Sequence, residues 1–287
     1  MRVGIDLGTT NTLVSYVDEN GTWKLLKFEH SGRRENPYFL PSCLAIKNGS
    51  IIVGQPAIDY CLEHPDLFLS NTKYDMGKTG TVYHLENYAI TPQEAAQHIL
   101  NEVYKELTFQ FPRETTFNAF VTVPARFGNE ARQTTKAALI SSNFETDESC
   151  LTDEPIAAAV AYSSMLTEDN LVLVVDIGGG TFDLSLLKTS MIGSVVTNRL
   201  EPVAWNGELR LGGNDVDEIL IKKMAQNSTF VHKNHGAIGK NHYLCIVFFM
   251  VLDLRLSRLG LSGVLFLCPC PTPLFHFLLL SSQKSSI

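Results

Sequence analysis

Up to about residue 232, short apolar runs of strand-like pattern alternate with segments of helical periodicity. The clearest helix is TPQEAAQHILNEVYKEL, where Thr91 is the expected N-cap, Pro92 stands in the first turn and Glu94 completes a capping box. Its apolar stripe consists of Ala95, Ile99, Val103 and Leu107. The pattern predicts an α/β protein, in which this helix packs against the core.

The pattern changes after residue 232. Apolar residues dominate from there to the end, charges are few, and neither the strand nor the helix period persists. Leu261 to Leu280 has no formal charge and is long enough to span a bilayer, which takes about 20 residues, but Pro269, Pro271 and Pro273 disfavour a spanning helix. We interpret residues 233–287 as an apolar tail outside the fold, from a truncated or misread gene, with a membrane anchor as the less favoured alternative.

Composition narrows the class of protein. A chain of 287 residues can bury a real core as one large domain or two lobes, and its net charge of -7 argues against nucleic acid or an anionic membrane as the main partner. No apolar leader follows the basic start. The six cysteines are scattered without metal-ligand spacing, which favours reduced thiols and a cytoplasmic protein.

Two segments share one plan. VGIDLGTTNTLVSYV near the N-terminus and LVVDIGGGTFDLSLL at Leu173 to Leu187 each have an apolar strand that ends in an aspartate, Asp6 or Asp176. A turn rich in glycine or hydroxyl residues follows, and alternation then resumes. Each copy therefore predicts a strand, a tight turn and a second strand.

These turns are not the phosphate loops that open helices. No lysine follows as in GxxxxGK[ST], and the dinucleotide fingerprint precedes a helix rather than a strand. Either turn alone is typical of an ordinary hairpin, but the pair could grip a polyphosphate through bare backbone N–H groups. Since two acids would repel phosphate, we expect Asp6 and Asp176 to share a Mg²⁺ ion through water.

At this point the motifs resemble a known family. GIDLGTTN, VTVPARFGNEARQTTKAA, DEPIAAAVAY, DIGGGTFDLSLL and LRLGGNDVDEIL occur in the order found in DnaK-type seventy-kilodalton heat-shock chaperones. The resemblance covers about residues 1–224. It implies the actin-like ATPase fold, α/β with duplicated ββ-hairpin phosphate loops, with a complete first lobe in residues 1–165 and an incomplete second lobe in residues 166–232.

The resemblance also implies roles for individual residues. Asp6 and Asp176 correspond to the acids that hold hydrated Mg²⁺. The implied catalytic residues are Lys73, Glu154, Asp176 and Thr181. The implied ATP-contacting residues are Gly8, Thr9, Thr10, Asn11, Gly178, Gly179, Gly180, Thr181, Gly212 and Gly213. The residues around Lys73 have diverged from the family pattern, so Lys78 is kept as a weaker alternative.

Pro124 and Arg132 match positions through which the family passes the nucleotide state to its substrate domain. Arg126 stands where the family usually has an aromatic residue, and Asn214 replaces an acid. The resemblance implies an ATP-hydrolysing chaperone whose partners are unfolded polypeptides and co-chaperones. However, the substrate domain and the segments that carry much of the adenosine pocket have no counterpart in this sequence. A non-catalytic binding module is therefore the alternative, and a sugar-kinase-like or actin-like protein a weaker third.

Overall fold

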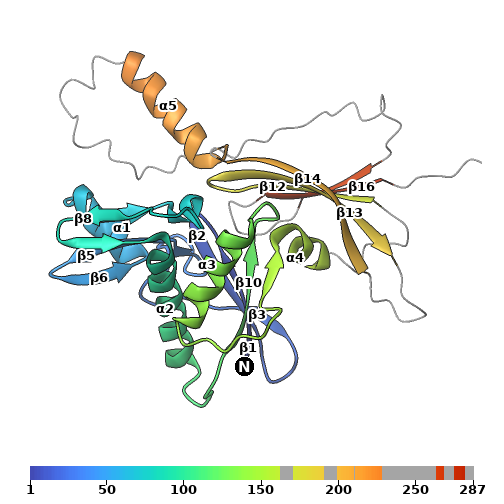
Figure 1. Ribbon diagram of the computed structural model, residues 1–287, viewed down its shortest axis with the longest axis horizontal. Helices are drawn as coiled ribbons and strands as arrows, with labels where there is room; N and C mark the ends of the chain where they lie inside the picture. The colour runs from blue at the N-terminus through green and yellow to red at the C-terminus, as the bar shows by residue number, and fades with distance from the viewer. Residues whose placement is uncertain (162–170, 191–198, 210, 228–262, 268–274, 282–287) are drawn as a thin grey trace, which may run out of the picture. The chain divides into compact units, whose positions relative to one another are not determined.

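The computed structural model describes residues 1–161, 171–190, 199–209, 211–227, 263–267 and 275–281, and these form a mixed α/β protein with several sheets (Figure 1). They divide into two compact units. Unit 1 contains Met1–Val123 and Phe127–Thr152. Unit 2 contains Pro124–Arg126, the described part of Asp153–Asn227 and the two last described segments.

The principal sheet of unit 1 is built around β1, which pairs in parallel with β10 and antiparallel with β2. The strand order is β11-β10-β1-β2-β3, and β4 pairs with β2. The strands are β1 (Arg2–Leu7), β2 (Asn11–Val17), β3 (Trp23–Leu25), β4 (Leu40–Pro41), β10 (Asn118–Val123) and β11 (Leu151–Asp153). The central place of β1 means that the turn after it is supported by strands on both sides.

Two helices pack with this sheet into one hydrophobic core, α2 (Pro92–Gln110) and α3 (Asn129–Ile140). The predicted start of α2 is confirmed: the Glu94 backbone N–H donates to Thr91 Oγ1 at 3.2 Å, and the Thr91 N–H donates to Glu94 Oε2 at 2.8 Å. The predicted stripe is also confirmed. Its members are all buried: Ala95, Ile99, Val103 and Leu107.

Smaller elements complete unit 1. A sheet of order β6-β5-β7 carries helix α1, and a separate hairpin joins β8 to β9. The bounds are β5 (Cys43–Lys47), β6 (Ser50–Val53), α1 (Gln55–Cys61), η1 (Pro65–Leu67), β7 (Phe68–Ser70), η2 (Thr72–Asp75), β8 (Tyr83–Leu85) and β9 (Tyr88–Ile90). In the described part of the chain, Cys43, Cys61 and Cys150 are buried, and burial raises the pKa of the Cys43 thiol to about 12.

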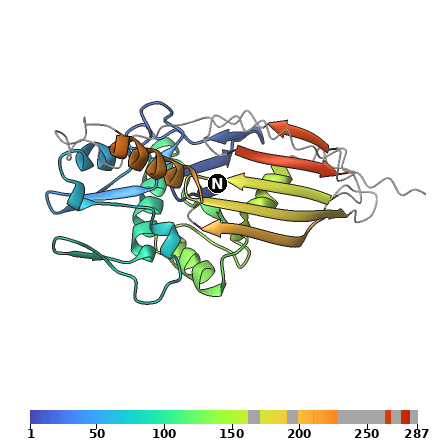
Figure 2. The ribbon, with the colours of Figure 1, turned by 90° about the horizontal axis from the view of Figure 1, so that it is seen from above.

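Unit 2 is one antiparallel sheet of order β14-β13-β12-β16-β15, whose strands lie side by side in Figure 2. Helix α4 packs on β12, where Ala159 joins Val172, Val174 and Leu187 in a small core. The elements are α4 (Glu154–Ala161), β12 (Leu171–Ile177), β13 (Thr181–Ser190), β14 (Arg199–Leu209), α5 (Gly213–Asn227), β15 (Gly263–Leu267) and β16 (Phe275–Ser281).

Helix α4 groups with unit 2, because it packs on β12. The lobe boundary expected at residue 165 stays a prediction. The tail expected in residues 233–287 lies mostly outside the described residues, but its two described segments are strands, and β16 pairs with β12 along the whole of β12. Within the described residues, no helix is long and apolar enough to cross a membrane.

Candidate functional site

The two hairpins expected from the repeat are present and have the same register. In each, the aspartate pairs across the strands with the residue seven positions later, Asp6 with Leu13 and Asp176 with Asp183. Four residues lie between the last paired positions of each hairpin. The repeat is therefore a repeat of backbone geometry as well as of sequence, and each aspartate stands one residue before the end of its strand pairing.

The first turn is held from inside unit 1. A Cβ added at Gly8 would lie 2.3 Å from the backbone oxygen of Asn11, so only glycine fits there. The side chain of Asn11 accepts a hydrogen bond from Arg33 Nε at 2.6 Å, and the Thr10 carbonyl accepts one from the Ser42 N–H at 2.9 Å. These contacts fix the path of the turn.

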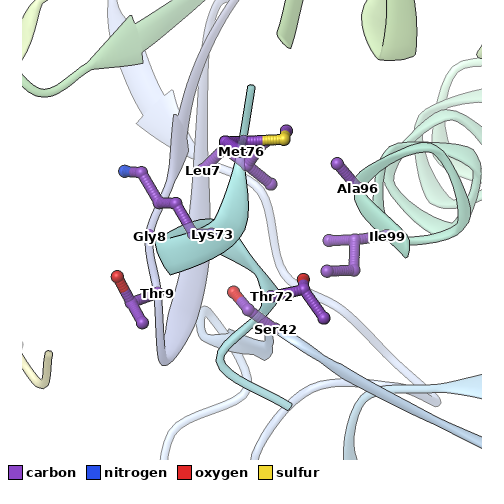
Figure 3. Close-up of a pocket in the computed structure, with 9 residues that line it drawn as sticks. All are labelled: Leu7, Gly8, Thr9, Ser42, Thr72, Lys73, Met76, Ala96 and Ile99. Atoms are coloured by element: carbon purple, nitrogen blue, oxygen red, sulfur yellow. The ribbon is translucent and has the colours of Figure 1, made fainter. Parts of the chain in front are cut away.

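Lys73, the lysine that the resemblance implies for catalysis, lies beside this turn. It belongs to η2, which follows Asn71 in a left-handed conformation (φ 61°), a conformation that asparagine adopts more readily than most residues. A small pocket of about 10 Å³ is lined by Leu7, Gly8, Thr9, Ser42, Thr72, Lys73, Met76, Ala96 and Ile99. In Figure 3 the Lys73 ammonium and the Thr9 side chain lie on the same side of the turn, away from Ala96 and Ile99.

The structure separates Lys73 from its alternative, Lys78. The Lys73 ammonium lies 6.0 Å from the centre of the Phe127 ring. Lys78 is half exposed and donates to Asp75 at 2.6 Å, and Tyr83 donates to the other oxygen of that carboxylate. Lys73 therefore lies next to the first turn, whereas Lys78 forms a surface ion pair with Asp75.

The carboxylate of Asp6 is oriented by the neighbouring strand. Thr122 Oγ1 on β10 donates to Asp6 Oδ1 at 3.0 Å, and Asp6 is half buried. On the opposite face of β1, Val3, Ile5 and Leu7 are buried in the core. The alternation of β1 therefore buries the apolar side chains and leaves the acid on the accessible face.

The second turn is held by the start of α5. The N–H groups of Gly213 and Asn214 donate to the carbonyls of Gly178 and Gly179 at 3.1 and 2.7 Å. A Cβ on Gly212 would lie 2.7 Å from backbone atoms of the turn. Four glycines predicted to contact ATP therefore lie close together: Gly178, Gly179, Gly212 and Gly213. Backbone hydrogen bonds join the turn to the start of α5.

Asp176 differs from its counterpart in the first hairpin, because it lies on the more buried face of its strand. It is 7% exposed and shares that face with Val172 and Val174. Its cross-strand partner, Asp183, is 8% exposed. Directly opposed residues of antiparallel strands point to the same side, so unit 2 places two buried carboxylates together.

Asp183 contacts a cation that the sequence analysis did not assign to the site. Arg126 Nη2 lies 3.3 Å from Asp183 Oδ2, and both side chains are about nine-tenths buried. The seven-residue spacing that pairs Asp176 with Asp183 could have been found from the repeat. The contact of Arg126, which is 57 residues away in sequence, has no local signal.

The remaining predicted residues lie where their elements place them. Glu154 is the first residue of α4 and is half buried, and Thr181 is the first residue of β13. Pro124 is buried directly after β10, and Arg132 Nε on α3 donates to the Phe127 carbonyl at 2.9 Å. Since Glu154 and Thr181 belong to unit 2 and Lys73 to unit 1, their meeting at one phosphate stays a prediction.

The oxygen donors around the turns suit Mg²⁺, a hard cation that prefers carboxylates and water. Asp6 presents a carboxylate held by a hydroxyl, and Asp176 presents one beside a second carboxylate. Among the described residues, no group of three or more His, Cys, Asp or Glu side chains could hold a metal ion.

Comparisons with known proteins agree with this geometry. A family model described as "Hsp70 protein" matches residues 77–242, more than half of the chain. The chain belongs to the Hsp70 family. This membership implies the actin-like ATPase fold and ATP with Mg²⁺ as the family's ligands.

Curated relatives are similar over most of this chain. "Chaperone protein DnaK" of Thermotoga neapolitana is 36% identical over 236 residues, which are 82% of this chain and 37% of that protein. "Chaperone protein DnaK" of Halobacterium salinarum is 33% identical over 225 residues, which are 78% of this chain and 33% of that protein. The chain thus spans about a third of the length of these Hsp70 relatives.

Proposed function

We propose that this Hsp70 chain binds ATP with Mg²⁺ through its two hairpin turns and hydrolyses it as part of a chaperone cycle. The observation that carries the proposal is the duplicated hairpin: two aspartates at the same register, each followed by a turn of four residues rich in glycine or threonine. A single turn of this kind would be unremarkable. Two copies, in an Hsp70 chain, support a polyphosphate clamp.

The two turns would contribute in different ways. In the second turn, α5 already donates hydrogen bonds to the carbonyls of Gly178 and Gly179. The Gly178 N–H is also used within the turn, where it donates to the Thr181 carbonyl at 2.9 Å. Backbone donors to a phosphate would therefore come from elsewhere in the turn. In the first turn, the hydroxyl of Thr9 and the ammonium of Lys73 lie on the same side. They would supply a donor and a positive charge to the terminal phosphate.

Hydrolysis would depend on placement of a water molecule more than on covalent chemistry by the protein. Lys73 and Thr181 would orient the terminal phosphate and the attacking water, and the Glu154 carboxylate would accept a hydrogen bond from that water. Asp6 and Asp176 would hold water molecules around the cation. When bound, Mg²⁺ would neutralise charge on the phosphate oxygens.

Partners and location follow from the family alone. Unfolded polypeptides and co-chaperones are the proposed partners, and the cytoplasm is the proposed location. The second candidate function, a binding module without turnover, would use the same turns and lack only hydrolysis.

Equilibrium binding of ATP with Mg²⁺ to the full chain, followed by single-turnover hydrolysis, tests the proposal. Asp176→Asn is the site variant, and Asp59→Asn is the control, because Asp59 pairs with Arg34 on the surface. We expect micromolar or tighter binding that Asp176→Asn weakens and Asp59→Asn does not. Undetectable binding at millimolar nucleotide by a folded sample would refute ATP binding, and binding without turnover would favour the second candidate.

A further inference from the structure

Arg126 is a buried arginine of unit 2 that has no role in the proposed ATP site. Its guanidinium Nη2 lies 3.3 Å from Asp183 Oδ2 on β13 and 3.5 Å from the carbonyl oxygen of Glu208 on β14. The side chain is 11% exposed. Arg126 thus reaches two neighbouring strands from the segment that follows β10.

The carboxylate that it contacts is tightly enclosed. Asp183 stands opposite Asp176 on β12 and opposite Gly207 on β14. A Cβ on Gly207 would lie 2.7 Å from Asp183 Oδ1 and 2.6 Å from the Phe182 backbone oxygen. Glycine at this position allows β14 to approach the carboxylate, so Asp183 has little room to turn away from its neighbours.

Two buried carboxylates on directly opposed strand positions would repel each other. Like charges at such positions are destabilising, and burial strengthens the effect because the surroundings screen less than water does. A buried charge is retained in a folded protein when a partner of opposite sign compensates it. The guanidinium of Arg126 can supply that compensation to Asp183. It also contacts β14, whereas Asp176 lies on β12, on the other side of β13.

We propose that Arg126 is a positioning residue of the second hairpin: it compensates the negative charge of Asp183 and thereby lowers the repulsion between the Asp183 and Asp176 carboxylates beside the second turn. The ion pair itself needs no nucleotide. The effect of the ion pair on ATP and Mg²⁺ binding rests on the proposed function. If the second turn binds a polyphosphate, excess negative charge beside that turn would weaken the binding.

The ion pair is tested first, by a double-mutant cycle on the full chain without nucleotide. Arg126→Met, Asp183→Asn and the double variant are compared with the wild type by thermal and urea unfolding. Each single change removes one member of the buried ion pair, so each should lower the midpoint, and the double variant should lose clearly less than the two losses added together. The control cycle uses Arg34 and Asp59, an exposed pair whose losses should be small and additive.

The consequence for ligand binding is tested with ATP and Mg²⁺. Arg126→Met should weaken binding by about tenfold or more, since the carboxylate that loses its cation adds negative charge beside the bound polyphosphate. Arg126→Lys, which keeps the charge, and Arg126→Met with Asp183→Asn, which removes the uncompensated carboxylate, should each recover most of the affinity. A residue that only fills space would not be rescued by removal of a charge on another strand.

The outcomes are separable. Additive losses in the unfolding cycle would overturn the ion-pair proposal, and so would a binding loss that neither Arg126→Lys nor Asp183→Asn restores. If Arg126→Met fails to fold, Arg126→Lys and the double variant still decide between charge compensation and packing. If the wild type binds no nucleotide, the binding half of the proposal falls with the proposed function, while the unfolding cycle still tests the compensation of Asp183.

Discussion

Gly212 and Gly213 are adjacent, but only Gly213 has room for a Cβ atom. A Cβ on Gly212 would lie 2.7 Å from three backbone atoms of the second turn, whereas a Cβ on Gly213 would meet Gly179 at an ordinary 3.8 Å. Gly212→Ala should therefore lower the free energy of unfolding by about 1–3 kcal/mol, because backbone cannot move aside as a side chain can. Urea unfolding measures this loss.

The neighbouring glycine provides the control for that prediction. Gly213 begins α5, where alanine has the better helix propensity, so Gly213→Ala should leave stability unchanged or raise it slightly. Equal losses for the two variants would contradict the close packing of Gly212 on the turn.

Lys73 and Lys78 allow a second comparison at the same scale. If Lys73 orients the terminal phosphate, Lys73→Ala should slow single-turnover hydrolysis by about 10²-fold and weaken ATP binding much less, since a misplaced reacting group costs rate more than affinity. Lys78→Ala removes only a surface ion pair with Asp75 and should leave the rate unchanged. A slower rate for Lys78→Ala alone would reverse the assignment.

At this scale the sequence indicated residue identities better than contacts. Lys73 was named through the family resemblance, and its part in hydrolysis stays a prediction, while the structure places it in the same small pocket as Gly8 and Thr9. The pairing of Arg126 with Asp183 could not be predicted, because it joins a segment after β10 to a strand 57 residues later. Such contacts depend on how strands are ordered in the sheet, and the local pattern does not encode that order.

Among the elements, α2 shows how far local rules reach. Its capping box, first-turn proline and buried stripe were all predictable, since each depends on residues within a few positions. Strand β13 shows where those rules end. Its apolar residues Phe182, Leu184 and Leu186 are only partly buried, while Asp183 and Ser185 on the other face are buried. The deeper face of β13 is therefore polar at the end nearest the turn, where Arg126 pairs with Asp183.

The capping box of α2 gives a prediction with a defined pH dependence. Hydrogen bonds from the backbone and then the hydroxyl of Thr91 hold the pKa of Glu94 below its ordinary value of 4.5. The ionised cap therefore stabilises the fold fully above that value, and its contribution is lost as the pH falls through the lowered pKa. Glu94→Gln should cost up to about 1 kcal/mol at pH 7, because solvent screens this exposed group, and nothing at the acid end.

Unfolding midpoints of Glu94→Gln and wild type between pH 3 and 7 measure the difference. Glu102→Gln is the control, because Glu102 is on the same helix and pairs only at 3.4 Å with Lys105, without capping the helix. A difference between Glu94→Gln and wild type that stays constant down to pH 3 would show that the carboxylate charge has no part in the cap.

For the whole molecule, the sequence predicted an α/β protein with a duplicated hairpin, and both are observed. It did not predict that β16 would pair with β12 from a segment so rich in leucine and phenylalanine that it has no strand period. It also gave no packing partner for α4, because the alanine-rich sequence of that helix could cover either sheet. Both differences concern which surface an apolar segment covers, and apolar patterning alone does not select the surface.

The clamp itself is a prediction about both units at once, and amide hydrogen exchange can test it. A ligand that binds only the folded state stabilises it by RT ln(1 + [L]/Kd), about 2.7 kcal/mol at 100 times Kd, and exchange of the protected amides slows accordingly. With ATP and Mg²⁺, peptides that cover β1–β2 and peptides that cover β12–β13 should both gain protection.

AMP with Mg²⁺ is the matched control, because it lacks the polyphosphate that the turns would hold. Protection confined to one hairpin would mean that the other is a structural repeat without a share in binding. Equal protection by AMP would mean that the ligand is held elsewhere than at its phosphates.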